Sequence, residues 1–158
     1  RDRPMAELKV GDKAPAVALL DQEGNKAKLS DFKGRKVLLY FYPKADTPGC
    51  TTQSCSVRDA ADELEQLGVA RLGISPDQPD KQKEFDDKHS LGFPLLSDAD
   101  HAVAEAYGAW GEKTMYGKTS MGIIRSSFLI DEKGKLAGAW YKVKPEATVP
   151  NAVEALAA

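Results

Sequence analysis

Two cysteines, five positions apart, are the residues of this chain best suited to chemistry. Cys50 follows the segment Pro43-Lys44-Ala45-Asp46-Thr47-Pro48-Gly49, and Cys55 lies shortly after it. Two cysteines in 158 residues are too few for a disulfide scaffold. A closed zinc site needs four ligands, and the cysteines and histidines show no finger-like spacing. We therefore interpret the cysteine pair as redox-active.

The residues before Cys50 are typical of a helix start. Thr47 is a good N-cap, and Pro48 suits the first helical position while pushing Thr47 toward the extended backbone that an N-cap needs. Cys50 then falls at the third helical position. There a thiolate would face unpaired backbone N–H groups and the positive end of the helix dipole.

A helix terminus alone does not supply enough energy to ionise a thiol. A free cysteine thiol has a pKa of about 8.5, and lowering it to about 6 requires roughly 3 kcal/mol. The helix terminus typically supplies about 0.3–1 kcal/mol, and about 2 kcal/mol in favourable cases. A positive side chain is therefore also needed. Arg58 is one candidate, but it lies about 12 Å beyond Cys50 on a helix and is better explained as a surface ion-pair residue.

The spacing of the cysteines has a geometric consequence for a bond between them. On an intact helix, positions five apart have Cα atoms about 8–9 Å apart, beyond the limit of about 7 Å for a disulfide. A Cys50–Cys55 bond therefore requires the first turns of the helix to unwind. The apolar stripe that begins at Val57 lies on the side of Cys50, so we expect Cys50 to face the core and Cys55 to face outward. A buried inert Cys50 and an incidental surface Cys55 are the alternatives.

Alternating strands and helices predict one α/β domain over residues 1–158, with a mixed sheet flanked by helices and an N-terminal β-hairpin. Apolar periodicity and turn residues delimit the elements. The expected strands are 16–20, 26–29, 37–42, 69–75, 93–96, 123–130 and 136–141, and the expected helices are 48–67, 80–88, 100–107 and 149–156.

Composition excludes several classes of function. The formal charge of -2 argues against a nucleic-acid partner, which would require a basic face. No apolar run approaches the roughly 20 residues that span a membrane, and the N-terminus lacks the apolar stretch of a signal peptide. A cytoplasmic location is therefore expected. Residues 1–4 are interpreted as an expression remnant ahead of a natural start at Met5.

Pro43, Thr47 and Cys50 match the signature P-x-x-x-T-x-x-C, through which the chain resembles the peroxiredoxins. The step from Cys50 to Cys55 is similar to that of the bacterioferritin comigratory protein branch, also called the Q type. The resemblance covers nearly the whole chain, through the segments GDKAP, FYPKADTPGCTTQSC, FPLLSD, AYGAWGEKTMYGK and GIIRSSFLID.

This resemblance implies a thioredoxin-like fold and an antioxidant peroxidase that reduces hydrogen peroxide and organic hydroperoxides without a metal, haem or flavin cofactor. It implies that Cys50 is the peroxidatic cysteine and that Cys55 resolves it through an intramolecular disulfide. Thr47 would hydrogen-bond the sulfur and the peroxide, Pro43 would shield the pocket, and Arg125 would supply the positive charge. Thioredoxin or a related dithiol would reduce the disulfide, and the resemblance favours a monomer.

Other candidate residues have less specific interpretations. His89 and His101 lie in polar helical stretches, so we expect exposed surface histidines rather than general bases. Trp110, Met115 and Tyr116 lie in a glycine-bounded loop, where lining the pocket and packing within the loop are equally consistent with the sequence.

Two other functions fit a cysteine pair. A thiol-disulfide oxidoreductase on the same fold typically carries C-x-x-C, which is absent here, and does not need Thr47 and Arg125. A redox-switched binding or chaperone protein would use oxidation to unwind the helix and expose a partner surface. Peroxide turnover separates these classes, because an enzyme turns over many times and a switch oxidises once.

Overall fold

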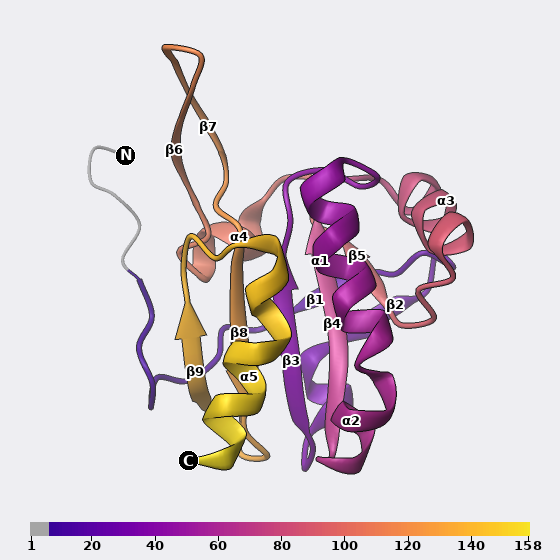
Figure 1. The fold of residues 1–158 in the computed structure, drawn as a ribbon, viewed down its shortest axis with the longest axis vertical. Coiled ribbons are helices and arrows are strands. Elements are labelled where there is room, and N and C mark those ends of the chain that lie inside the picture. Colours follow the sequence, from indigo (N-terminus) through magenta and orange to yellow (C-terminus); the bar gives the residue numbers. More distant parts are fainter. Residues whose placement is uncertain (1–6) are drawn as a thin grey trace.

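A seven-stranded mixed sheet forms the centre of the computed structural model, which describes residues 7–158 apart from the side chain of Met115. The strand order is β2-β1-β5-β4-β3-β8-β9, with β3, β4 and β5 parallel and the outer strands antiparallel to their neighbours (Figure 1). The strands are β1 Ala18–Leu20, β2 Lys26–Lys28, β3 Lys36–Phe41, β4 Val69–Ser75, β5 Leu95–Ser97, β6 Trp110–Met115, β7 Lys118–Ile123, β8 Ser126–Ile130 and β9 Leu136–Trp140. The expectation for residues 1–4 lies outside the described residues.

Helices cover both faces of the sheet (Figure 1). α1, α2, α3 and α5 contribute to the clusters on one face, and α4 packs on the other. The helices are α1 Pro48–Asp59, α2 Ala61–Gln66, α3 Pro79–His89, α4 Ala102–Ala106 and α5 Thr148–Ala157, with short 3-10 helices η1 Leu29–Phe32 and η2 Pro145–Ala147. The predicted mixed sheet flanked by helices, with an N-terminal hairpin, is confirmed.

The central strand β3 is buried on both of its faces, as its apolar run predicts. Val37, Leu39 and Phe41 point into the cluster that includes α4. Leu38 and Tyr40 alternate with them and point toward α1, α2 and α5. All five side chains are at most 1% exposed. β3 therefore packs directly beneath the helix that carries the cysteines.

The helix predicted over 48–67 is instead divided at Ala60 into α1 and α2. The carbonyl of Val57 accepts from the Ala60 N–H at 3.3 Å and from Arg71 Nη1 at 3.5 Å, which replaces the regular helical pattern at this point. α2 then packs Leu64 against the sheet. The apolar periodicity of residues 48–67 does not reveal the hydrogen bond that Arg71 of β4 donates to the Val57 carbonyl.

The two-stranded hairpin β6–β7 projects from the body of the protein and was not predicted (Figure 1). The strand expected over 123–130 is consequently divided between β7 and β8. Tyr116 and Gly117 both have positive φ, 53° and 77°, as a two-residue hairpin turn of type I′ requires. Most residues of the hairpin are exposed, so its strands lack the alternating apolar pattern that would predict them. In the sequence, only the turn residues Tyr116 and Gly117 indicated a hairpin here.

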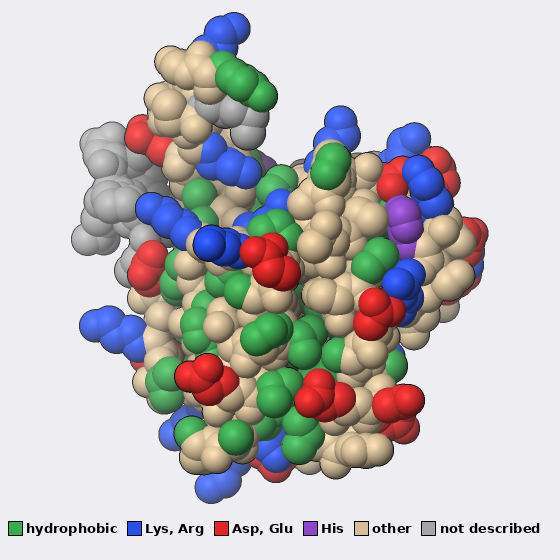
Figure 2. Space-filling model, viewed as in Figure 1, with side chains coloured by type: hydrophobic (Ala, Val, Ile, Leu, Met, Phe, Trp, Pro, Cys, Tyr) green, Lys and Arg blue, Asp and Glu red, His purple; other side chains and the backbone are tan. Residues whose placement is uncertain are grey.

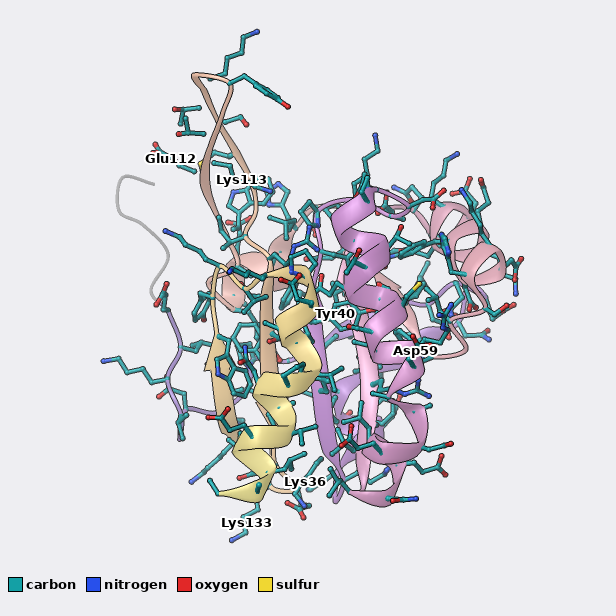
Figure 3. All side chains as sticks on the ribbon, in the orientation of Figure 1. Lys36, Tyr40, Asp59, Glu112, Lys113 and Lys133 are labelled. Carbon is teal, nitrogen blue, oxygen red and sulfur yellow. The ribbon has the colours of Figure 1, made fainter. Side chains whose placement is uncertain are left out.

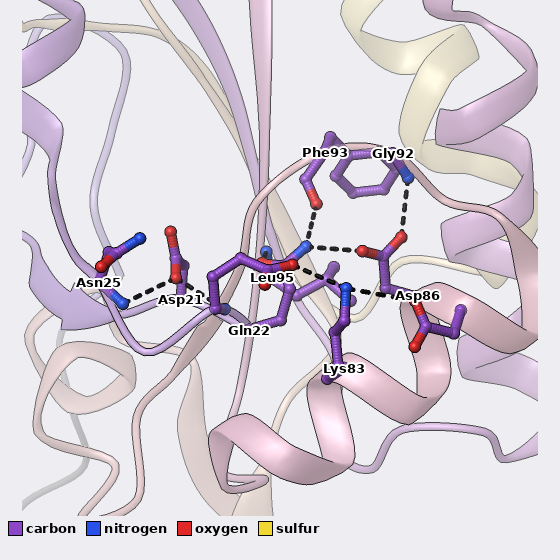
Figure 4. A network of polar contacts seen from close by, with 10 residues as sticks. Asp21, Gln22, Asn25, Lys83, Asp86, Gly92, Phe93 and Leu95 are labelled. Carbon is purple, nitrogen blue, oxygen red and sulfur yellow. Dashed lines mark hydrogen bonds and ion pairs between the residues drawn. The ribbon is translucent and has the colours of Figure 1, made fainter.

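A polar network fixes the N-terminal hairpin to the segment between α3 and β5 (Figure 4). Gln22 Nε2 donates to Asp86 Oδ2 at 3.1 Å and to the carbonyl of Phe93 at 2.8 Å. Gln22 Oε1 accepts from the Leu95 N–H at 2.8 Å, and Asp86 also accepts from the Gly92 N–H. These bonds satisfy the backbone where the chain enters β5.

The surface mixes charges of both signs. On the face drawn in Figure 2, acidic and basic side chains are interspersed with hydrophobic ones. Among residues 7–158, no helix combines the length and the apolar character that crossing a bilayer requires. Within that same range, the structure brings together no group of three or more His, Cys, Asp or Glu side chains suited to a metal ion.

Candidate active site

The first turn of α1 holds Cys50 in a buried position. α1 begins at Pro48, so Thr47 is the N-cap residue and Cys50 is the third helical residue, which confirms the prediction from the sequence. The backbone of Thr47 is extended, with φ −89° and ψ 157°, and its carbonyl accepts from the Thr51 N–H at 2.8 Å. Cys50 is 1% exposed and packs in the cluster that contains Tyr40. The sulfur therefore lies near the positive end of the helix dipole with little water around it.

The Thr47 side chain is used differently from the expectation of an N-cap. It does not cap the helix; its Oγ1 donates to the carbonyl of Lys44 at 2.8 Å, within the loop that follows β3. Because that bond uses the hydroxyl proton, the lone pairs of Oγ1 are left as acceptors. Pro43, in the same loop, is half-buried. The bonds expected from Thr47 to the sulfur and to peroxide stay a prediction.

Arg125 brings its guanidinium to the sulfur of Cys50. Nη1 and Nη2 lie 3.6 Å and 3.5 Å from Sγ. Arg125 follows β7, where its carbonyl accepts from the Val143 N–H at 3.0 Å. Gly49 permits this approach, because a Cβ there would lie 3.0 Å from Nη2 of Arg125. The positive charge that the energy argument demanded is thus in contact with the sulfur.

Gln53 is a residue of this site that the sequence analysis missed. It is fully buried one turn after Cys50, where Oε1 accepts from Arg125 Nη1 at 2.7 Å and Nε2 donates to Thr148 Oγ1 at 2.9 Å. Thr148 is the first residue of α5, so this amide links α1 to α5 and to the arginine. A buried and satisfied polar chain of this kind restricts the orientation of its members. The sequence indicated this residue only by placing a polar side chain on the face of α1 that was expected to pack against the core.

Arg58, the other cation considered, points away from Cys50 and toward α3. Its Nη1 donates to the carbonyl of His89 at 2.7 Å, and its Nε donates to Asp59 Oδ1 at 2.9 Å. The hydrogen bond to Asp59 raises the pKa of Arg58 above its usual value, and a negative charge on Cys55 raises it further. Arg58 therefore acts on the environment of Cys55.

Cys55 is half-buried, so the expectation that it faces outward is wrong. It packs against the cluster that contains Cys50, Phe85 and Leu91. Phe85 belongs to α3 and Leu91 follows it, so the tertiary structure supplies an apolar cluster at Cys55 that the helix pattern alone does not show. Both cysteines are free thiols on an intact α1.

The two histidines are also more enclosed than expected, because each has a partner in the tertiary structure. The side chain of His89 is 21% exposed, and its Nε2 lies 2.9 Å from Asp46 Oδ1. His101 Nδ1 lies 2.7 Å from Glu105 Oε2, and the side chain of His101 is 35% exposed. These contacts give both rings structural roles on α3 and at the start of α4.

The residues of the glycine-bounded loop separate in the structure. Trp110 stacks on His101 at the start of α4 with ring centroids 3.7 Å apart and packs against the core cluster, so it packs against the body of the protein rather than within the loop. Tyr116 is 97% exposed at the tip of the hairpin and lines no pocket. The side chain of Met115 lies outside the described residues. Lys113 of the same hairpin, which the sequence analysis did not single out, is half-buried near Arg125.

Comparison with known proteins agrees with this geometry. The model of the AhpC/TSA family matches residues 10–139. The chain belongs to the AhpC/TSA family. A putative peroxiredoxin bcp of Haemophilus influenzae is 55% identical over 89% of this chain and 90% of its own length. Peroxiredoxin Bcp of Escherichia coli (strain K12) is 56% identical over 84% of this chain and 85% of its own.

Solved structures of peroxiredoxins share the fold. Peroxidoxin BcpB of Mycobacterium tuberculosis superposes with a TM-score of 0.85 at 35% identity, covering 96% of this chain and 97% of its own. Peroxiredoxin Q of Xanthomonas campestris superposes with a TM-score of 0.83 at 36% identity, covering 89% of both chains. The thioredoxin-like fold and the bacterioferritin comigratory protein branch are thereby confirmed. This AhpC/TSA family member is a peroxiredoxin, a thiol peroxidase.

Proposed function

We propose that Cys50 is the peroxidatic nucleophile of this peroxiredoxin and that it reduces hydrogen peroxide and organic hydroperoxides. The observation that carries the proposal is the buried Cys50 sulfur at the start of α1, 3.5 and 3.6 Å from the guanidinium nitrogens of Arg125. Both the helix dipole and the arginine favour the thiolate, which is the nucleophilic form. A bacterioferritin comigratory protein of Xanthomonas campestris, 35% identical, is described for its alkyl peroxide reduction activity, which supports the same class of substrate.

The chemistry follows from the groups around the sulfur. The Cys50 thiolate attacks the distal oxygen of the peroxide, the O–O bond breaks, and Cys50 becomes a sulfenic acid. Arg125 and the backbone N–H groups at the start of α1 stabilise the charge that develops on the oxygens. The acceptor lone pairs of Thr47 Oγ1 orient the peroxide hydroxyl, and Pro43 shields the reacting atoms from solvent.

Cys55 completes the cycle as the resolving cysteine. Its thiol condenses with the Cys50 sulfenic acid, which releases water and forms an intramolecular disulfide. The first turns of α1 unwind for this step, because an intact helix holds the two Cα atoms about 8–9 Å apart. Thioredoxin or a related dithiol then reduces the disulfide by exchange, and the chain acts as a monomer.

A steady-state assay that couples peroxide reduction to NADPH through thioredoxin and its reductase tests this proposal. Cys50→Ser should abolish turnover. Cys55→Ser should react once with peroxide and leave a sulfenic acid or a mixed disulfide, which mass spectrometry detects. Thr52→Ser, at an exposed position of α1, is the matched control and should turn over normally. A Cys50→Ser protein that keeps turning over would end the assignment, and a wild type that oxidises once without recycling would indicate a redox switch.

A further inference from the structure

Lys113 lies on the side of the β6–β7 hairpin that faces α1, whereas Glu112 lies on the opposite side (Figure 3). Its partner across the hairpin is Ser120, but its stem runs over Gly122, where an added Cβ would lie 3.1 Å from Lys113 Cδ. Gly122 itself pairs with Gly111. Two facing glycines leave a bare strip of backbone on this side of the hairpin. The lysine stem lies along that strip and runs toward the base of the hairpin.

The base of the hairpin is also where Arg125 is held. β7 ends at Ile123, and the next residue, Ile124, donates its N–H to the carbonyl of Ala109 at 2.8 Å. Arg125 follows directly. The Lys113 side chain is half-buried, and the positive charge of Arg125 and a negative charge on Cys50 both act on its ammonium. Burial and then the charge of Arg125 lower the pKa of Lys113 from its usual value, while a Cys50 thiolate acts in the opposite direction.

The peroxide step also requires a proton donor for the departing oxygen. When the O–O bond breaks, the departing oxygen leaves as an alkoxide or hydroxide, which is a strong base and must take up a proton. Arg125 is a poor donor, because a guanidinium does not lose its proton in proteins. The hydroxyl proton of Thr47 is committed to the carbonyl of Lys44. A lysine ammonium that gives up its proton more readily than usual is suited to the task.

We propose that the Lys113 ammonium is the general acid of the peroxide step, a role that rests on the proposed thiol peroxidase function. The Cys50 thiolate forms a bond to the distal oxygen, which keeps its hydrogen and becomes part of the sulfenic acid. The electron pair of the broken O–O bond stays with the other oxygen, which takes a proton from Lys113 and leaves as alcohol or water. Sulfur is thereby oxidised by two electrons and the peroxide is reduced. The neutral amine of Lys113 regains its proton from solvent.

The test compares two peroxides whose leaving groups differ in their need for a proton. The alkoxide that leaves tert-butyl hydroperoxide is a strong base, whereas the acetate that leaves peracetic acid needs no proton. Stopped-flow rate constants for Cys50 oxidation are measured for the wild type, Lys113→Arg and Lys113→Met. Lys118→Arg and Lys118→Met, at an exposed position of the same hairpin, are the matched controls.

Lys113→Arg keeps the positive charge but removes the usable proton. We expect it to slow the reaction with tert-butyl hydroperoxide by about 100-fold, the lower end of general-acid contributions, and to change the reaction with peracetic acid by less than about twofold. The wild-type rate with tert-butyl hydroperoxide should also fall at alkaline pH as the ammonium is lost, at a lower pH than an ordinary lysine would give, because its pKa is lowered. Lys113→Arg should remove that fall.

Equal slowing with both peroxides would overturn the proposal, because Lys113 would then act through the Cys50 thiolate or the structure of the site. Unchanged rates with both peroxides would overturn it as well. In either case the wild-type turnover would still support the thiol peroxidase. A wild type that reduces neither peroxide would contradict the proposed function itself.

Discussion

Oxidation of Cys50 and Cys55 to a disulfide is expected to melt the first half of α1, and this change is measurable residue by residue. Both cysteines lie on one continuous helix in the reduced protein. Because the bond cannot form across that helix, the segment from about Thr47 to Val57 must lose its helical hydrogen bonds, and Cys50 must leave its buried position.

The magnitude of the change follows from the side-chain bonds that must break with the helix. Gln53 loses its bond from Arg125 and its bond to Thr148, and Ser54 loses its buried bond with Tyr40. Hydrogen bonds to charged groups contribute about 1.5–3 kcal/mol and neutral ones about 0.5–1.5 kcal/mol. The three bonds together therefore contribute about 2.5–6 kcal/mol to the closed helix. Since about 1.4 kcal/mol is tenfold in an equilibrium constant, the lower value corresponds to roughly 60-fold.

Hydrogen-exchange mass spectrometry on the reduced and oxidised protein provides the measurement. Peptides over residues 47–57 should exchange at least about 60-fold faster after oxidation, while peptides over the central strand 37–42 stay protected. Peroxide-treated Cys55→Ser is the matched control, because it cannot form the bond and should keep α1 protected. Global stability should fall on oxidation, since so short a loop constrains the unfolded chain only weakly. Equal protection in both redox forms would refute the reasoning and place the resolving partner outside the chain.

Three substitutions test the surroundings of the sulfur. Arg125→Met should slow the peroxide step, because it removes the guanidinium whose nitrogens lie 3.5 and 3.6 Å from the Cys50 sulfur, as followed by stopped-flow rate constants; an unchanged rate would assign the charge to another cation. Gln53→Ala leaves the arginine without its acceptor at 2.7 Å, and we expect a loss of about tenfold or more in the peroxide rate with an unchanged circular dichroism spectrum, with partial rescue by Gln53→Glu. Asp46 forms an ion pair of 2.7 Å with Lys88, and this pair fixes the loop before α1 to α3. Asp46→Asn should therefore speed disulfide formation, measured by quench-flow, but by less than about fivefold, because exposed ion pairs contribute little to stability. Hydrogen bonding to Lys88 lowers the pKa of Asp46, so this stabilisation is present above the carboxyl's unfolded pKa and is lost as the pH falls through the lower folded value. A difference in stability between Asp46→Asn and wild type that does not change as the pH falls through this range would contradict the assignment.

The sequence by itself determined the features that depend on local backbone chemistry. Pro48 fixes where α1 begins, and with Thr47 it sets Cys50 at the third helical position. The spacing of the cysteines follows from helix geometry alone, and it implies that a bond to Cys55 must unwind the helix. The apolar run over 37–42 likewise determines a strand buried on both faces, because neighbouring side chains of a strand point to opposite faces.

Only the tertiary structure decided which groups surround the two sulfurs. Arg125 was identified through a family resemblance, and its contact with Cys50 joins residues 75 positions apart. Distant elements also meet where Gln53 accepts from Arg125 and where Cys55 packs against a cluster that includes Phe85 of α3. Lys113 likewise reaches the base of the β6–β7 hairpin from a separate strand. Periodicity and turn chemistry act over a few residues, and they report which face of a helix is apolar. They do not report which remote side chain will pack on that face, because packing depends on the sheet order that brings separate segments of the chain together.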